Sequence, residues 1–351
     1  MILLSLVFVI NAILLYVAIP FILGQFPWLS RYLIFKTKDV LGFNEENYQF
    51  FQGVELSCKS SRNFYVESWD TNDRLGVWHI LPYEAEVATQ LDSTQNDATA
   101  FEISLAHGEP VFIYFHGNSK SRATPWRVNI YKLLSSLGYH VIAFDYRGYG
   151  DSTGSMTSEQ DCVYDCLAVL DYVYAHCGDA PVFFWGHSLG TGIVGALVRH
   201  LLNEGTPVQP QLRLPKGIIL DAPFTNLVQA VVSARSMLPY RYVPYWHRRF
   251  ASIASRQNIE FHTESNLANC SIPIMILHAE DDYLVPFRQG EKLALTLGAH
   301  PENKVHFVRF GKNRGYKHNF IHTAPEMPEL LRSFVRSVMN GEPLPTIPTA
   351  L

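Results

Sequence analysis

The chain has 351 residues, of which 48% are hydrophobic and 17% are charged, and its formal net charge is -4. This length allows one large catalytic domain or two small ones with a substantial core, and the composition is not that of a disordered chain. Because the net charge is slightly negative, the basic surface that neutralises nucleic-acid phosphates is not expected, and nucleic acid is a poor candidate partner.

The N-terminus has the pattern of a membrane segment. Residues 1–30 carry no charged side chain, and residues 2–23 are almost continuously apolar, which is enough for a helix that crosses a bilayer core. We predict a transmembrane signal anchor over residues 1–24 and a juxtamembrane connector over residues 25–60. A cleaved signal peptide is the alternative, but the apolar run is longer than usual and no basic segment precedes it. The lysines and arginines after the span would by themselves favour a cytosolic domain.

After the connector, residues 64–69 and 75–81 have the pattern of an antiparallel hairpin, and residues 82–109 form a polar stretch that we interpret as a surface insertion. From residue 111 onward, short apolar runs alternate with helical patterns, which favours parallel strands joined by crossover helices. The predicted strands are 111–115, 140–144, 181–185, 217–221, 273–278 and 304–310, and the predicted helices are 123–137, 158–177, 189–203, 287–298 and 326–339. Residues 341–351 are a C-terminal tail.

The alternation stops over residues 223–266. Residues 237–250 are aromatic, basic and interrupted by proline, so we predict a cap over the edge of the sheet where the strands end. Its arginines could contact an anionic group, although surface arginines are more often solvated. These arginines are Arg235, Arg241, Arg248 and Arg249.

The five cysteines form no C-x-x-C pair and have no histidine pair at zinc-ligand spacing. We interpret them mostly as buried thiols, with a single disulfide left open, and we expect neither a metal nor an organic cofactor.

The most informative segment is Val182–Gly192, which places a G-x-S-x-G motif between an apolar strand and a helix. A sharp turn at this position exposes the serine, and Gly186 and Gly190 leave room for the neighbouring backbone. This pattern predicts a nucleophile elbow with Ser188 as the nucleophile, and His187 occupies the variable position before it.

Acyl transfer also needs two amide donors for the negative charge that develops on the carbonyl oxygen. The Leu189 amide at the start of the helix is one candidate. The Asn118 amide, in the loop His116–Ser119 after a predicted strand, is the other. A simple glycine turn is the alternative for this loop, and we interpret His116 as structural rather than catalytic.

A serine nucleophile requires a base, and the base requires a carboxylate that orients it. Asp282, which follows the strand at 273–278, is the predicted acid, with Asp221 and Asp281 as alternatives. His318, in a loop after the last strand, is the predicted base, with His322 as the alternative.

The turn at residues 144–152 follows another strand. Asp145 and Arg147 could pair there and brace the adjacent loops, and we interpret these residues as structural.

Serine, acid and histidine in this order resemble the α/β-hydrolase superfamily over residues 60–340. Several runs are more specifically similar to the family of α/β-hydrolase-domain protein twelve, whose members are lysophosphatidylserine lipases that also act as monoacylglycerol lipases. These runs are Ser135–Val141, Phe144–Gly148, Trp185–Gly192, Pro223–Asn226, Ile276–Asp282 and Gly315–His318. The chain departs from the family at Ser119–Arg122, where the family has small residues.

The resemblance implies an α/β-hydrolase fold over residues 61–340, with a mostly parallel eight-stranded sheet flanked by helices and a small cap at about 223–266. It also implies a single-pass anchor in the endoplasmic reticulum membrane, a lumenal catalytic domain, and hydrolysis of one acyl ester of a lysophospholipid or monoacylglycerol. The sequon at Asn269 suits a lumenal domain. The alternatives are an acyl-protein thioesterase, a small-ester carboxylesterase and a non-catalytic binding protein.

Overall fold

The computed structural model describes residues 34–37, 42–83, 98–203, 212–234 and 245–344, together with isolated positions between residues 7 and 31. Most of the predicted anchor at 1–24 therefore lies outside the described residues. Among the residues that are described, no helix combines the length and the apolar character needed to cross a membrane.

Eight strands form one sheet in the order β1-β2-β4-β3-β5-β6-β7-β8. The strand β2 is antiparallel to both of its neighbours, and the other neighbouring strands are parallel. The mostly parallel, eight-stranded sheet that we expected is thus confirmed. The strands are β1 (Ser61–Glu67), β2 (Arg74–Ile80), β3 (Val111–Phe115), β4 (His140–Phe144), β5 (Val182–His187), β6 (Gly217–Asp221), β7 (Ile274–Ala279) and β8 (Val305–Phe310).

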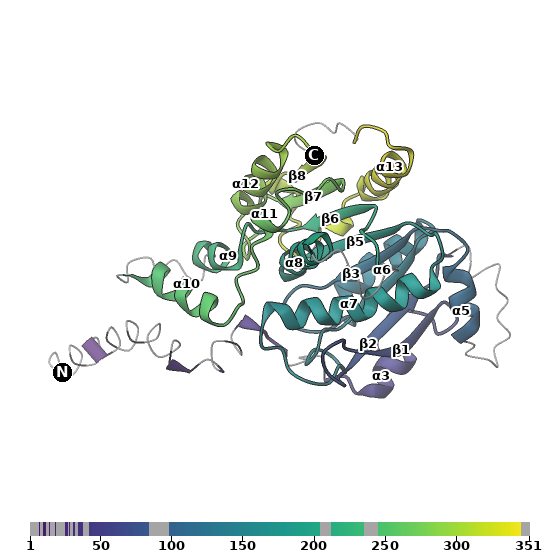
Figure 1. Ribbon diagram of the computed structural model, residues 1–351, viewed down its shortest axis with the longest axis horizontal. Helices are drawn as coiled ribbons and strands as arrows, with labels where there is room; N and C mark the ends of the chain where they lie inside the picture. The colour runs from purple at the N-terminus through teal and green to yellow at the C-terminus, as the bar shows by residue number, and fades with distance from the viewer. Residues whose placement is uncertain are drawn as a thin grey trace.

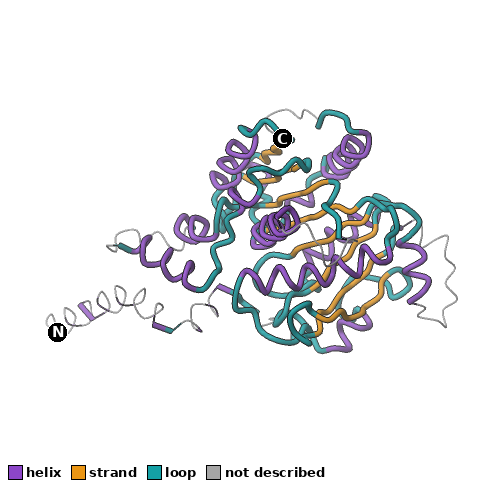
Figure 2. Tube along the Cα trace, viewed as in Figure 1, coloured by secondary structure: helices purple, strands orange, loops and turns teal. Residues whose placement is uncertain are grey.

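Helices cover both faces of the sheet, as Figures 1 and 2 show. The apolar side chains of α7, α8 and α12 share one core cluster, and those of α6 and α13 share the other. Such two-sided burial is expected of parallel strands, whose residues face a helix layer on either side. The helices are α3 (Glu45–Phe50), α5 (Ala98–Leu105), α6 (Pro125–Ser136), α7 (Glu159–His176), α8 (Leu189–Asn203), α9 (Leu227–Ser233), α10 (Trp246–Arg256), α11 (Thr263–Asn266), α12 (Phe287–Gly298) and α13 (Met327–Asn340), with short 3₁₀ turns η2 (Lys312–Arg314) and η3 (Ile321–Thr323).

Two predicted elements differ from the structure. The strand β1 begins at Ser61, three residues earlier than the aromatic run suggested, because polar Arg62 and Asn63 are buried and bonded to Tyr172 and Arg122. The stretch that we interpreted as a surface insertion contains the helix α5, which packs against α7. Both differences arise from tertiary contacts that no local pattern contains.

Asp145 and Arg147 are structural, as predicted, but they bind other partners rather than each other. The Asp145 carboxylate binds Arg122, with 2.6 Å between Oδ2 and Nη1, beneath the loop that follows β3. Arg147 instead faces α7, where its Nη2 lies 2.7 Å from Oδ1 of Asp165. The two side chains leave the turn toward different neighbours, so each braces a different loop.

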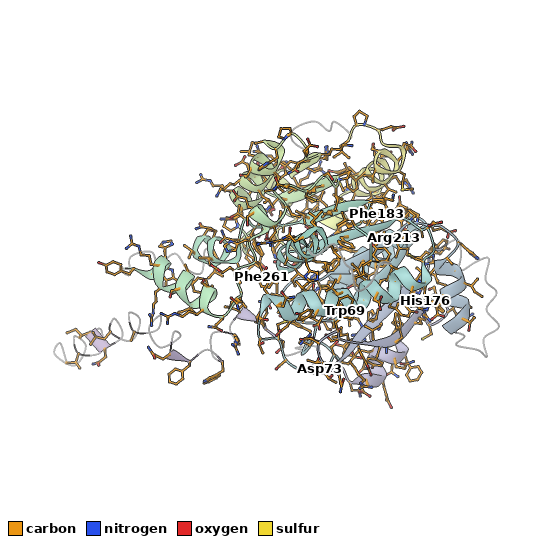
Figure 3. The ribbon with its side chains drawn as sticks, viewed as in Figure 1. Trp69, Asp73, His176, Phe183, Arg213 and Phe261 are labelled. Carbon is orange, nitrogen blue, oxygen red and sulfur yellow. The ribbon has the colours of Figure 1, made fainter. Side chains whose placement is uncertain are left out.

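The segment at residues 34–37 lies against the cap. The ring of Phe35 is buried and meets Phe261 edge to face, with 6.4 Å between ring centroids. Phe261, labelled in Figure 3, lies between the cap helices and the body of the domain. The helices α9 and α10 therefore join the rest of the domain close to the chain that leads to the predicted anchor. All five cysteines are free, and four of them are buried.

Candidate active site

The turn between β5 and α8 is a strained elbow. Ser188 has a φ of 52°, in the left-handed region that non-glycine residues rarely occupy. A Cβ atom on Gly186 would lie 2.7 Å from the Gly190 carbonyl oxygen, and one on Gly190 would lie 2.0 Å from the Phe115 carbonyl oxygen. The glycines therefore allow the close backbone approach that presents the Ser188 hydroxyl at the end of the sheet.

The structure brings Ser188, His318 and Asp282 together although they are far apart in the sequence. The Nε2 atom of His318 lies 2.9 Å from Oγ of Ser188, and its Nδ1 atom lies 2.7 Å from Oδ2 of Asp282. Because the carboxylate accepts the Nδ1 proton, neutral His318 presents an unprotonated Nε2 to the serine hydroxyl.

Asp282 is held in its ionised form. Burial opposes the charge, but the combined effect of His318 and His278 outweighs burial and places the pKa of Asp282 well below its usual value. The Oδ1 atom accepts the backbone N–H groups of Leu284 and Val285 at 2.8 and 2.9 Å. These bonds fix the carboxylate and leave Oδ2 for His318.

The alternative acids occupy other positions. Asp221 ends β6, and burial raises the pKa of its carboxyl to about 8, which makes it a poor partner for an imidazolium at neutral pH. Its backbone oxygen accepts the N–H of Ser188 at 2.9 Å. Asp281 accepts the backbone N–H of Lys317 at 3.0 Å and so supports the loop that carries His318.

The alternative base, His322, lies away from this cluster. Its Nδ1 atom is 3.0 Å from the carbonyl oxygen of Asn319, and burial lowers its pKa. Unlike His318, it is not among the residues that line the pocket at Ser188.

His187 has a role that the motif alone did not reveal. Its Nε2 donates to the backbone oxygen of His318 at 3.0 Å, which fixes the loop of the candidate base. Burial, reinforced by repulsion from His318, lowers the pKa of His187 to about 3, so the ring stays neutral. A non-local bond of this kind leaves no signal in the sequence.

The amides of Asn118 and Leu189 both belong to pocket-lining residues beside Ser188. Neither backbone N–H has an acceptor among the parts of the chain that the structure describes. Two free donors beside a nucleophile suit a developing oxyanion. His116 is buried, with its Nε2 3.2 Å from Asp145, as expected of a structural histidine.

The side chain of Asn118 connects this loop to the segment at residues 34–37. Its Oδ1 accepts the backbone N–H of Lys36 at 3.0 Å and the hydroxyl of Tyr149 at 2.9 Å, and its Nδ2 donates to the carbonyl of Ile34. One amide side chain therefore joins the candidate oxyanion loop to the chain that follows the predicted anchor.

Arg127, which the sequence analysis did not single out, lies beneath the same loop. Its side chain is buried, and its guanidinium donates to the carbonyls of Gly117, Ser119 and Ser121 at 2.7 to 2.9 Å. An arginine carries its charge at every physiological pH. Arg127 thus orients the loop and places a positive charge near the two free amides.

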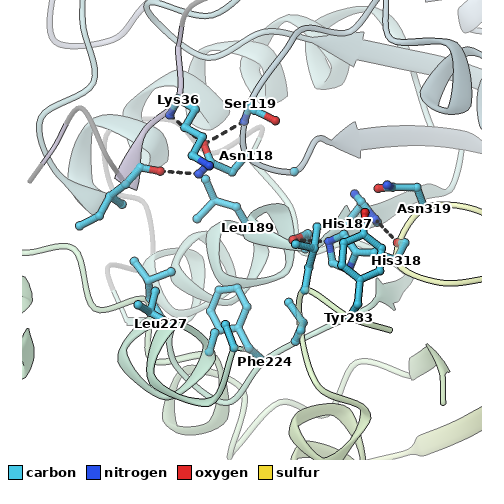
Figure 4. A pocket seen from close by; sticks show the side chains of 18 of the residues that line it. Lys36, Asn118, Ser119, His187, Leu189, Phe224, Leu227, Tyr283, His318 and Asn319 are labelled. Atoms are coloured by element: carbon cyan, nitrogen blue, oxygen red, sulfur yellow. Dashed lines mark hydrogen bonds between the residues drawn. The ribbon is translucent and has the colours of Figure 1, made fainter. Parts of the chain in front are cut away.

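Ser188 opens into a pocket of about 620 Å³, which lies within the ~300–1,000 Å³ range of small-molecule sites. The pocket is lined by apolar residues of α9, α10 and the loop after β7, and by the candidate oxyanion loop and the segment at 34–37. Figure 4 shows Leu227 and Asn118 on opposite sides of Leu189. Within the described residues, no group of three or more His, Cys, Asp or Glu side chains is arranged to share a metal ion.

Comparisons with known proteins agree with this architecture. Residues 110–205 match the family model described as the alpha/beta hydrolase fold. The chain is 39% identical to lysophosphatidylserine lipase ABHD12 of Gallus gallus, over 91% of this chain and 81% of that protein. It is 38% identical to the protein of the same name from Xenopus tropicalis, over 92% and 80%.

Among solved structures, an alpha-beta hydrolase from Vibrio vulnificus covers 89% of this chain and 93% of its own length, with a TM-score of 0.58 and 18% identity. At that identity the similarity concerns the fold alone.

Proposed function

Because the chain belongs to the ABHD12 family of α/β-hydrolase-fold proteins, we propose that it is a serine lipase that hydrolyses the acyl ester of lysophosphatidylserine-like lysophospholipids and of monoacylglycerols. The observation that supports this proposal most strongly is the 2.9 Å contact between Ser188 Oγ and His318 Nε2 at the floor of a partly apolar pocket. The catalytic residues of this proposal are Ser188, His318 and Asp282.

The reaction begins when His318 takes the proton of Ser188 and Oγ attacks the ester carbonyl carbon. The amides of Asn118 and Leu189 hold the oxyanion of the tetrahedral intermediate. His318 then protonates the departing glycerol oxygen, and an acyl-enzyme remains. A water molecule that His318 deprotonates attacks this ester, the acid is released, and Ser188 regains its proton. Throughout, Asp282 stabilises the imidazolium.

The pocket chemistry supports a lipid ester. Leu227 and Val231 of α9, with Trp246 and Phe250 of α10, form an apolar wall that suits an acyl chain leaving a bilayer. An anchor over residues 1–24 would keep this pocket at the membrane, where such lipids reside.

We also propose that the protein resides in the endoplasmic reticulum membrane with its catalytic domain in the lumen. The support is the apolar N-terminal stretch, the family resemblance and the exposed side chain of Asn269 in its sequon.

A substrate panel tests the activity. Purified protein and Ser188→Ala are incubated in neutral detergent micelles with lysophosphatidylserine, lysophosphatidylcholine, a monoacylglycerol and a palmitoylated peptide thioester of matched chain length. We expect the first and third to be cleaved by the parent protein, and Ser188→Ala to be slower by about 10⁴-fold or more. If only the thioester is cleaved, the protein is an acyl-protein thioesterase and not a lipase. If no substrate is cleaved in a manner that depends on Ser188, the lipase assignment is refuted.

A further inference from the structure

The charged residues of the pocket all have the same sign. Among the described residues that line it, Lys36, Lys120 and Arg127 are cationic, and none is an aspartate or a glutamate. Asp282 lies behind His318 and does not line the pocket. A cavity wall that collects cations without carboxylates attracts an anionic part of a ligand.

The lysines and the apolar wall come from different elements: the lysines from the segment at 34–37 and the loop after β3, and the wall from α9 and α10. Lys36 is grouped with Asn118 and Ser119 in Figure 4, whereas Phe224 and Leu227 lie on the other side of Leu189. In a lysophospholipid the carbonyl carbon that Ser188 attacks separates the acyl chain from the glycerophosphate. An acyl chain on the apolar wall therefore directs the phosphate toward the wall that carries the lysines.

Both lysines are positioned by specific contacts. The backbone of Lys36 is bonded to Asn118 at 3.0 Å, and the neighbouring Phe35 is buried. The Nζ atom of Lys120 lies 4.1 Å from the centre of the Trp126 ring, as in a cation–π pair. Lys120 has a φ of 60°, a conformation that costs energy in a non-glycine residue and that often marks a functional position.

Exposure distinguishes the lysines from the arginine. Lys36 is exposed and Lys120 is half-buried, so their ammonium groups can contact a ligand. Arg127 is buried and bonded to three loop carbonyls, so it contributes positive potential rather than a direct contact. The arginines of the predicted cap are not part of this cationic group among the described residues. Arg248 and Arg249 do not line the pocket. Arg235 and Arg241 lie outside the described residues.

We propose that Lys36 and Lys120 form a subsite for the headgroup phosphodiester of the lysophospholipid, and that this subsite favours anionic lysophospholipids over uncharged monoacylglycerols. The inference rests on the proposed lipase function and assigns headgroup selection within it.

A competition assay tests the subsite. Lysophosphatidylserine and a monoacylglycerol with the same acyl chain are presented together in neutral micelles, and the ratio of the two hydrolysis rates gives the ratio of kcat/KM values. The variants are Lys36→Gln, Lys120→Gln and the double variant. Lys132→Gln is the control, because Lys132 lies on α6, pairs with Glu55 at 2.7 Å and does not line the pocket.

We expect the double variant to reduce the preference for lysophosphatidylserine by about tenfold or more, through a higher KM for that substrate, because it loses two charge-assisted contacts with the phosphodiester. Monoacylglycerol hydrolysis should fall much less than lysophosphatidylserine hydrolysis in the double variant, and the Lys132→Gln ratio should stay within about twofold of the parent ratio. The ratio is independent of the fraction of protein that is folded.

An unchanged ratio in the double variant, or equal losses on both substrates, would overturn the subsite. Failure of the parent protein to hydrolyse either lipid would instead refute the proposed function. The two failures are therefore distinguishable.

Discussion

Two carboxyl groups near Ser188 are held in different protonation states by their surroundings. Asp282 is surrounded by His318, His278 and two backbone N–H groups, whereas Asp221, one strand away, is buried with a raised pKa. The same side chain is thus held as an anion in one place and as a neutral acid in the other.

Substitution of these two acids should separate their roles. Asp282→Asn should lower kcat by about 10⁴-fold with a small change in KM, because an amide can stabilise neither the required imidazole tautomer nor the imidazolium. Asp221→Asn should retain most of the activity. Steady-state rates of both variants on a soluble ester are compared. A larger loss of kcat in Asp221→Asn would identify Asp221, at the end of β6, as the catalytic acid.

Asp221 should also couple stability to pH. In the unfolded chain the pKa of Asp221 is its ordinary value of 3.8, whereas burial raises the pKa in the folded protein to about 8. The folded state binds more protons in this window, so stability due to this group is lost as pH rises. The free energy of unfolding of Asp221→Asn, relative to the parent, should rise by up to about 1.4 kcal/mol per pH unit between about pH 4 and 8. Chemical denaturation at several pH values measures this difference in the free energy of unfolding, and a difference that does not change with pH would contradict the prediction.

At the level of single residues, the sequence was sufficient to nominate Ser188, His318 and Asp282, and the structure brings all three into contact. It was not sufficient for His187 and Arg127. Their contacts go to backbone carbonyls of loops that are distant or irregular, and a carbonyl is present at every position of any sequence.

At the scale of the elements, the close contact between α8 and β3 explains why the turn at Ser188 should tolerate few substitutions. The helix α8 begins directly after Ser188, and its first turn is pressed against the end of β3 at Gly190. Gly190→Ala should cost about 3 kcal/mol or more, since the nearest atom is a backbone oxygen that no side-chain rotation can move. Thermal unfolding measures this loss.

Gly298→Ala is the matched control for that measurement. Gly298 ends α12, and a Cβ atom there would meet nothing within 4 Å. We expect its stability to stay within about 1 kcal/mol of the parent. Equal destabilisation by the two alanines would show that the elbow is not tightly packed.

The contact between Asn118 and residues 34–37 should also matter for catalysis. Asn118→Ala removes the bonds to Ile34 and Lys36 and loosens the loop that carries a proposed oxyanion donor. The lost hydrogen bonds contribute about 1–1.5 kcal/mol to holding the loop in its orientation, so kcat on a soluble ester should fall by about tenfold. Asn340→Ala, whose amide contacts Glu342 at the end of α13, serves as the control. An unaffected kcat in Asn118→Ala would mean that the segment holds no part of the loop in place.

Regular elements were largely predictable, because parallel strands buried on both faces appear as apolar runs between helical patterns. The strands at 111–115, 140–144 and 217–221 have the predicted bounds. The helix α5 was not predicted, since it follows a polar stretch and buries chiefly Phe101 and Leu105. Its stability depends on α7, which lies far along the chain.

On the scale of the whole molecule, the chain that follows the predicted anchor reaches the pocket. The segment at residues 34–37 belongs to the predicted connector, shortly after the predicted anchor at residues 1–24, and lines the pocket through Ile34 and Lys36. A lipid that leaves the bilayer would therefore meet the cap and the lysine-bearing wall together.

Membrane orientation has a direct readout in Asn269, which is exposed. If the domain is lumenal, a glycan on Asn269 should shift the mobility of the protein, and glycosidase treatment or Asn269→Gln should remove that shift. Intact microsomes should protect the domain from added protease. An unmodified protein that protease digests without membrane permeabilisation would contradict the proposed orientation.

The central claim is that His318 and Asp282 convert the hydroxyl of Ser188 into a nucleophile. A fluorophosphonate probe, followed by peptide mass spectrometry, tests it most directly. We predict one adduct, on Ser188, that is absent in Ser188→Ala and forms at least about 10³-fold more slowly in His318→Ala. No adduct, or an adduct on another residue that forms equally well in Ser188→Ala, would contradict the claim.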